Sequence, residues 1–512
     1  MARINTNPAS LIAQRNLSSN TNSLNSTLER LSTGLRINRG KDDPAGLIAS
    51  ENLRAEKSAL SAAIGNAERT DQLVNIAEGG LQELSNLLTE VRALVTSSAN
   101  TAGLSIEERQ ANQLQIDSIL QTIDRLADAT NFQGVKLLNG NLDFTANAIA
   151  SGVSDYRINA AKLSKGGNVS VQALITTSAQ QGSLFLSTGT SLNLAGGTQG
   201  LFTIEVAGQF GSRELSFASG TTRQTIVDAI NTYTDVTGVS ASLFNSSTSA
   251  GLRLNSTNYG SDGFVSVRVV NAANIQGAGV GVYRAIGTNA NAPDSSQQTL
   301  FTSQAAKNAT RDPGQDLVAT INGVAATTKG RTARINTDFL DVEITFNAVT
   351  ATRTNGLSSV NAFTITGGGA DFQLASRVDI AGKVALGIQS VSTRNLGNSS
   401  VGLLSGLAAG KEFNVVDGDL VKAGKVVDEA IRQVSALRGR LGAFQKNTVG
   451  ATIRNLGVSF ENSSAAESVI RDADFASETA ALTRGQILAQ AAQNSLGLAN
   501  SQPQSALQLL RG

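Results

Sequence analysis

The chain has 512 residues, and its 41 basic and 40 acidic side chains leave a net charge of +1, which gives no electrostatic basis for binding nucleic acid or an anionic membrane. It contains no Cys and no His, which excludes disulfides, thiolate catalysis and imidazole-based mechanisms, so we expect no enzyme, no cofactor and no metal site. The sequence has no run of about 18 apolar residues to cross a bilayer and no N-terminal apolar run of signal-peptide length.

The N-terminal region, from Asn5 to about Asn139, has a helical pattern. Its first apolar stripe repeats every seven residues and is supported by apolar residues at intervals of four. The stripe consists of Leu17, Leu24, Leu28, Leu31 and Leu35. A seven-residue repeat predicts long helices that are wound on partners.

A second and longer stripe follows the turn RINRGKDDPAG, in which Asp43 and Pro44 are expected to cap and start the next helix. Its members are again seven residues apart: Leu53, Leu60, Ala67, Val74, Leu81, Leu88 and Val95. A third helix is indicated by Ile116, Ile119, Ile123 and Leu126.

The middle of the chain, from about Asn141 to Gly410, changes in character. Short alternating runs such as Phe202–Val206 and Val265–Val269 lie between turns rich in Gly, Ser and Asn, which predicts antiparallel strands. One helix is expected at Thr221–Thr232. The run Leu317–Ile321 leads into Asn322-Gly323, which is typical of a β-hairpin.

The helical pattern returns from about Asp417. One stripe consists of Val427, Ile431, Val434, Leu437, Leu441 and Phe444, and the last segment places Phe475, Leu482, Ala489, Leu496, Pro503 and Leu510 at seven-residue steps. The fold class is therefore expected to be α+β, with long terminal helices that pair as a coiled coil and a β-rich domain inserted mid-chain.

Both ends of the chain are almost free of charge. The first 28 residues carry only Arg3 and Arg15, and after Glu478 only Arg484 and Arg511 are charged. Helices so poor in charge are marginal alone in water, which favours burial against other copies of the chain. The alternative is an ordinary antiparallel helix pair within one subunit. The expected assembly residues are Leu17, Leu24, Leu28, Leu31, Leu35, Leu482, Ala489, Leu496 and Leu510.

Four segments, together with the final SQPQSALQLLRG, resemble bacterial flagellin in the right order. They are LSTGLRINRGKDDPAG at Leu31–Gly46, NFQGVKLL at Asn131–Leu138, RDADFA at Arg471–Ala476 and LTRGQIL at Leu482–Leu488. In the middle, residues 201–270 resemble an insert repeat found in flagellins and hook-associated proteins. DFQLASRVDIAGKVALG at Asp371–Gly387 resembles the strands that return to the inner domain of the family.

The resemblance implies three domains. Residues 1–40 and 472–512 would form an inner coiled-coil domain. Residues 41–180 and 370–471 would form a helical domain with short β-hairpins, and residues 181–369 an exposed β-rich outer domain.

The resemblance also implies a function. The chain would be a structural subunit that self-assembles into the flagellar filament for swimming motility. It would be secreted through the flagellar export apparatus with a chaperone, and would meet hook-associated junction and cap proteins. Three alternatives remain: a hook–filament junction protein with similar ends, an enzyme displayed on the filament, and an adhesin that binds a surface glycan. The metallopeptidase insert of some flagellins needs paired His, which this chain lacks.

One departure from the enteric family pattern concerns receptor recognition. The segment that matches Leu87–Asn100 is recognised in enteric flagellins by the vertebrate flagellin-sensing Toll-like receptor. Glu90 stands where those flagellins have Arg, Leu94 is retained, and Gln115 replaces a partner Glu. A reversed charge in a polar interface is costly, so we expect weak receptor activation.

Overall fold

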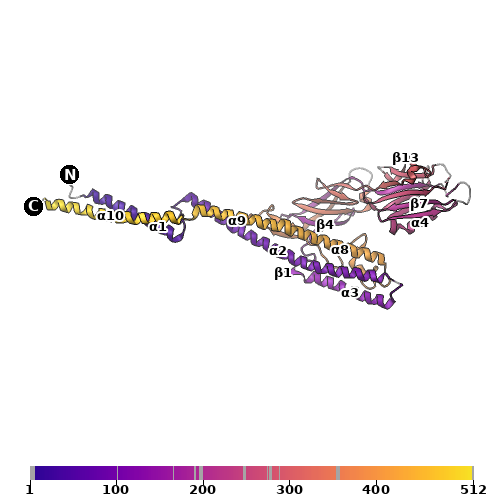
Figure 1. Ribbon diagram of the computed structural model, residues 1–512, viewed down its shortest axis with the longest axis horizontal. Coiled ribbons are helices and arrows are strands. Elements are labelled where there is room, and N and C mark those ends of the chain that lie inside the picture. Colours follow the sequence, from indigo (N-terminus) through magenta and orange to yellow (C-terminus); the bar gives the residue numbers. More distant parts are fainter. Residues whose placement is uncertain are drawn as a thin grey trace. The chain divides into compact units, whose positions relative to one another are not determined.

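The computed structural model describes two compact units, shown in Figure 1 and treated separately below. The terminal unit comprises residues 1–74, 372–383 and 442–512, and the central unit comprises residues 75–371 and 384–441. The described residues are 6–100, 102–164, 166–188, 192–194, 200–245, 250–273, 275, 279–286, 289–352 and 358–509. In this described part, no helix combines the length and the hydropathy needed to cross a membrane.

The terminal unit is helical. Helix α1 (Pro8–Thr33) begins where Asn7 accepts a hydrogen bond from the amide of Ser10, and it ends at Gly34, whose φ of 71° is left-handed. Helix α10 (Phe475–Leu509) pairs with α1. Gly34 is a common helix terminator because it adopts this conformation without a Cβ clash.

The first part of α2 (Pro44–Ser98) pairs with α9 (Gly450–Arg471) in the terminal unit. The side chains of Leu60, Ala63 and Leu456 form a small buried core between them. Asp43 accepts a hydrogen bond from the amide of Gly46, which confirms its expected capping role before Pro44. A π-helical segment, η2 (Phe444–Val449), precedes α9.

Outside the two β modules, the described helices of the central unit are the rest of α2, α3 (Ile106–Ala129), most of α8 (Leu420–Ala443) and the 3₁₀ turn η1 (Leu404–Leu407). The seven-residue stripe of α2 is buried here as predicted, since Leu81, Leu88 and Val95 are inaccessible or nearly so. Ile116 and Ile123 of α3 are also fully buried. Helix α3 begins with a capping box between Ser105 and Glu108.

Two β modules complete the central unit, and Figure 1 labels β4 in the first and β7 in the second. The first module packs sheet β16-β15-β5-β20-β3 and sheet β17-β18-β19-β4 around one hydrophobic core. Its elements are β3 (Phe144–Asn147), β4 (Val153–Ala161), β5 (Val169–Thr177), β15 (Val318–Ile321), β16 (Val324–Ala325), β17 (Thr327–Lys329), β18 (Thr332–Asn336), β19 (Leu340–Phe346), α7 (Ala348–Ala351) and β20 (Ser358–Gly368). The expected hairpin at Asn322-Gly323 is confirmed, because both residues have positive φ between β15 and β16.

The second β module is inserted between β5 and β15 of the first. It packs sheet β13-β12-β6-β10-β9 and sheet β14-β11-β7-β8 around its own core, which α4 covers. Its elements are β6 (Gln181–Ser187), β7 (Phe202–Gly208), β8 (Ser212–Phe217), α4 (Arg223–Thr232), α5 (Thr234–Thr237), β9 (Val239–Asn245), β10 (Ala250–Tyr259), β11 (Phe264–Asn271), β12 (Gly281–Ile286), β13 (Asn289–Thr299), α6 (Gln304–Lys307) and β14 (Thr310–Pro313). The predicted helix at Thr221–Thr232 therefore exists, and it begins two residues later because Thr222 is its N-cap.

The remaining strands form three short hairpins: β1 (Asn131–Phe132) with β2 (Val135–Lys136), β21 (Ala370–Gln373) with β22 (Lys383–Leu386), and β23 (Gly397–Asn398) with β24 (Gly402–Leu403). The α+β class expected from the sequence is confirmed, with helices at both ends of the chain and strands between them.

Candidate assembly surface

The candidate site is the outer surface of the α1–α10 pair in the terminal unit, where the two helices lie side by side (Figure 1). They run antiparallel. Asn7 Nδ2 donates to the carbonyl of Ala499 at 2.8 Å, and near the other end Arg30 Nη1 lies 3.3 Å from Glu478 Oε1. The N- and C-terminal segments are thus brought together by contacts distributed along the whole pair.

The connection between α1 and α2 is hydrogen-bonded to the junction between α9 and α10. The carbonyl of Gly34 accepts from the amide of Ala473, and the amide of Arg36 donates to the carbonyl of Arg471 at 2.7 Å. Ile37, which lies within this connection, is buried. Asp42 accepts from the amides of Asn38 and Arg39. Mainly the hydrogen bond from the Arg39 amide holds the pKa of Asp42 below its usual value.

The nine expected assembly residues differ in position and burial. Among the eight that the structure describes, Leu28 is exposed, and the rest are half-buried: Leu17, Leu24, Leu31, Leu35, Leu482, Ala489 and Leu496. Leu510 lies outside the described residues. The seven-residue stripes therefore run along the pair, but this pairing leaves them partly open to solvent.

Small side chains fill most of the closest contact between α1 and α10. The buried residues of α1 are Ser10, Ala13 and Thr27, and Ala492 is buried on α10. The exposed large apolar side chains on the two helices are Leu11, Ile12, Leu28, Phe475, Ile487, Leu488 and Leu498. Ile487 is 65% exposed and Leu498 67%. Apolar surface of this extent on two weakly charged helices is typical of an interaction site.

The three residues of the expected receptor segment lie on central-unit helices. Glu90 on α2 and Gln115 on α3 are exposed, whereas Leu94 on α2 is half-buried. The side chains of Glu90 and Gln115 are therefore accessible at the helix surface, and Glu90 carries a negative charge there.

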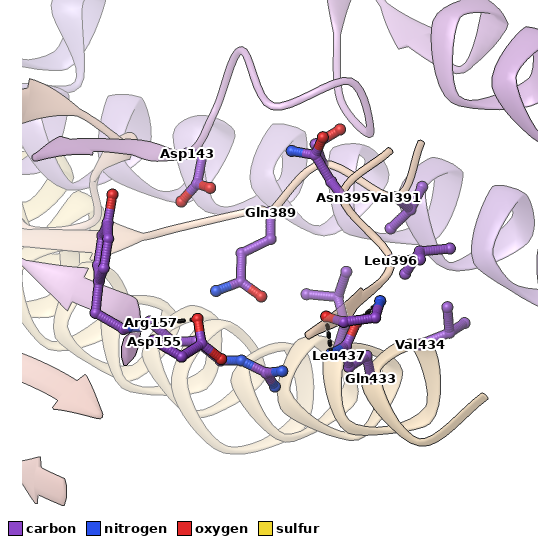
Figure 2. A pocket seen from close by; sticks show the side chains of 13 residues that line it. Asp143, Asp155, Arg157, Gln389, Val391, Asn395, Leu396, Gln433, Val434 and Leu437 are labelled. Atoms are coloured by element: carbon purple, nitrogen blue, oxygen red, sulfur yellow. Dashed lines mark hydrogen bonds between the residues drawn. The ribbon is translucent and has the colours of Figure 1, made fainter. Parts of the chain in front are cut away.

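A polar cavity of about 140 Å³ in the central unit contains titratable side chains. Figure 2 shows Asp143 and Gln389 pointing into the same space, with Asp155 and Arg157 on another side of it. Burial raises the pKa of both Asp143 and Asp155. A volume of this size accommodates a few water molecules, each of which needs roughly 30 Å³.

The surroundings of this cavity indicate a structural role. Gln433 of α8 exchanges two hydrogen bonds with the backbone of Gly397, at 3.0 and 2.7 Å. Arg440 of α8 donates to Asn159 of β4 and to the carbonyl of Gly387. Burial lowers the pKa of Arg440 to about 10. The contact with Asn159 attaches α8 to the first β module, and the contacts with Gly387 and Gly397 attach α8 to the segment just after β22 and to β23. In the described part of the chain, no group of three or more Asp, Glu, His or Cys side chains is placed to hold a metal ion.

Sequence comparison adds independent information about both ends. Residues 4–143 match the family model of the bacterial flagellin N-terminal helical region, residues 425–510 that of the C-terminal helical region, and residues 202–258 the flagellin hook IN motif. The B-type flagellin of Pseudomonas aeruginosa is 32% identical over 557 aligned positions that cover 99% of each chain. A flagellin of Salmonella choleraesuis is 29% identical, again with 99% of each chain covered.

Solved structures of other flagellar proteins are distantly similar to this chain. The D2–D3 domains of the flagellar cap protein from Serratia marcescens match 40% of this chain and 98% of their own, at 19% identity and a TM-score of 0.26. Flagellar hook associated protein-3 from Legionella pneumophila matches 82% of this chain and 96% of its own, at 12% identity and a TM-score of 0.25.

Proposed function

We propose an assembly mechanism for this chain, which belongs to the bacterial flagellin family and is a structural subunit of the flagellar filament. In this mechanism the open apolar stripes of α1 and α10 are covered by the corresponding helices of other copies. The family is a structural one, and the proposed activity is mechanical rather than catalytic.

The observation that supports the proposal is the contrast between two stripes of the same period. On α2, Leu81, Leu84 and Leu88 are completely buried within one chain. On α1 and α10, the described assembly residues are half-buried or exposed even though the two helices are paired. The terminal stripes therefore have apolar surface left to bury, and each buried CH₂ group contributes roughly 0.8 kcal/mol.

Assembly and ordering of the ends would then be coupled. With few buried side chains, the α1–α10 pair is expected to open readily in a dilute monomer. Contact with the end of a growing filament supplies the missing apolar partners, so the helices become ordered as they bind. Because the contacting surfaces of successive copies differ and the contact does not close on itself, the product is an open helical polymer.

The layers of the filament follow from the same mechanism. Residues 1–40 and 472–512 would form the innermost coiled-coil layer, and residues 41–180 and 370–471 would make the next layer of subunit contacts. Residues 181–369 would form the exposed outer domain. Support comes from the α1–α10 pairing and from the position of the β-rich insertion in the chain.

The proposed partners follow from membership of the family. Besides copies of itself, the chain would contact the hook-associated junction proteins, the cap protein, the export apparatus and an export chaperone. The chain would be secreted unfolded, and the lack of Cys suits such a route because no premature disulfide can form. We propose no nucleic-acid and no membrane partner, since the net charge is only +1.

The alternative of a hook–filament junction protein predicts a limited complex rather than an extended polymer. The test is electron microscopy of purified chain added to short filament seeds. The full chain should lengthen the seeds in proportion to the amount added, whereas chains lacking residues 1–40 or 472–512 should not. Full chain that binds a seed end once and then stops growing would support the junction role and contradict the proposal.

A further inference from the structure

The strongest unassigned site lies in the central unit, in a cleft of about 510 Å³ beside the junction of the two β modules. The second module contributes the end of β10, including Asn258 and Tyr259, and the first module contributes Lys329, Arg331 and Thr332. Ligand sites in proteins commonly have volumes of roughly 300–1,000 Å³ and commonly lie between domains. The size and place of this cleft are therefore those of a small-molecule site.

Arg331 is the distinctive group in the cleft. Its guanidinium carbon lies 5.1 Å from the centroid of the Tyr259 ring, a distance at which the ring attracts and orients the cation. Among the described residues, Arg331 has no carboxylate within salt-bridge distance. A planar guanidinium that is oriented but has no anion to bind is suited to a carboxylate, which it can bind through two parallel hydrogen bonds.

The other charged groups of the cleft already have partners. Lys329 Nζ lies 2.8 Å from Asp262 Oδ2. Asp316 accepts hydrogen bonds from the amide of Gly330 and from both the amide and the hydroxyl of Ser261. Arg432 pairs with Glu429. Arg331 is thus the charge in the cleft that is left for a ligand, and the ligand should be an anion.

The neutral part of the lining indicates a polyhydroxylated molecule. Asn258 donates to Gln209 at 2.7 Å, and the hydroxyls of Thr332 and Thr345 lie 2.9 Å apart. These amides and hydroxyls retain further donors and acceptors for ligand hydroxyls. Tyr259 is the aromatic residue of the lining. We propose that the cleft binds a carboxylated saccharide of the uronic-acid type, with Arg331 on the carboxylate and the amide and hydroxyl side chains on the sugar hydroxyls.

The probe is trigalacturonic acid, and its fully methyl-esterified form is the matched ligand because esterification removes the charge and keeps the sugar. Binding to the purified full chain is measured by isothermal titration calorimetry. We expect saturable binding of the acid and at least tenfold weaker binding of the ester. Equal binding of the two, no binding of the acid, or displacement by an equal concentration of inorganic sulfate would overturn the proposal.

Substitutions at Arg331 test whether its guanidinium binds the ligand directly or whether any positive charge on the protein has the same effect. Arg331→Gln should weaken binding of trigalacturonic acid roughly tenfold or more, since a hydrogen-bonded charge is lost. Arg331→Lys should bind the acid more tightly than Arg331→Gln but less tightly than the unmodified chain, because an ammonium cannot form the two parallel hydrogen bonds. Arg213→Gln is the matched control, since Arg213 lies 4.9 Å from the Tyr233 ring centroid outside the cleft. Equal losses in Arg331→Gln and Arg213→Gln would also overturn the proposal, provided that thermal unfolding shows both variants folded.

Discussion

Leu24 of α1 packs directly against Gly485 of α10. A β-carbon at position 485 would lie 3.2 Å from Cδ1 of Leu24, closer than side chains normally approach each other. The two helices meet at this point because one of them has no side chain there. The seven-residue pattern predicts Leu24 as a contact residue, and the structure identifies Gly485 as the surface that receives it.

Gly485→Leu should push α1 and α10 apart. Inserting a large side chain into a packed contact costs about 1–3 kcal/mol. The variant filament should therefore depolymerise at a lower temperature than the filament of the unmodified chain, as measured by light scattering during heating. Leu24→Ala combined with Gly485→Leu should recover part of the loss, because the smaller residue makes room. If the two changes prove strictly additive, the residues are not in contact.

Removal of the charge at Asp143 should stabilise the central unit near neutral pH. Burial raises the pKa of Asp143, so the folded state binds a proton more tightly than the unfolded state, and the ionised carboxylate lowers the stability at pH 7. Asp143→Asn should raise the midpoint of thermal unfolding at pH 7, and this gain should disappear as the pH falls below about 4, where the unfolded carboxyl also becomes protonated.

Asp128→Asn is the matched control for that experiment. A hydrogen bond from Lys136 lowers the pKa of the exposed Asp128, so its charge favours the folded state above the unfolded pKa. Asp128→Asn should therefore lower the midpoint of thermal unfolding at pH 7 slightly, whereas Asp143→Asn should raise it. A lower unfolding midpoint for Asp143→Asn at pH 7 would show that Asp143 is stabilised as a carboxylate.

The hydrogen bonds of Asp316 should stabilise the junction of the two β modules. It accepts from the Gly330 amide at 2.7 Å on the first module and from Ser261 on the second. Asp316→Ala should lower the free energy of unfolding by about 2 kcal/mol, the scale of hydrogen bonds to a charged group, in urea titrations followed by circular dichroism. Asp428→Ala should change it by less than about 1 kcal/mol, because Asp428 pairs with Arg92 and both side chains are more than half exposed. Equal effects would mean that Asp316 does not join the modules.

Glu90→Arg should raise activation of the vertebrate flagellin-sensing Toll-like receptor. The exposed Glu90 places a negative charge where enteric flagellins have a positive one, and Gln115 lacks the charge of their Glu. In a receptor reporter assay, Glu90→Arg combined with Gln115→Glu should increase the potency about tenfold or more. Glu83→Arg, on the same helix but outside the matched segment, should leave it unchanged. Enteric-level potency of the unmodified chain would contradict this account.

The sequence predicts elements with a local signal better than contacts between distant segments. The α2 stripe of Leu81, Leu88 and Val95 is visible as a period of seven and is buried accordingly. The Asn322-Gly323 hairpin is equally local. Arg331 and Tyr259, by contrast, meet because β5 and β15 flank an inserted module, and no short pattern specifies that arrangement.

For the terminal stripes, the sequence does not predict how much of the apolar surface a single chain buries. The period of Leu17, Leu24 and Leu31 indicates which side of α1 is apolar, and the structure places these residues along the pair with α10. How much of that surface a single chain buries depends on the partner helix. The polar cavity at Asp143 and the π-helical segment η2 likewise have no sequence signal, because both result from how packed elements fit together.

Hydrogen exchange of the full chain, as dilute monomer and as filament, tests most directly whether the terminal helices find their apolar partners in other copies. Amides of α1 and α10 should exchange quickly in the monomer and at least about 100-fold more slowly in the filament, while amides of α2 between Val74 and Val95 should be protected in both. Protection of α1 and α10 in the monomer equal to that in the filament would contradict the account.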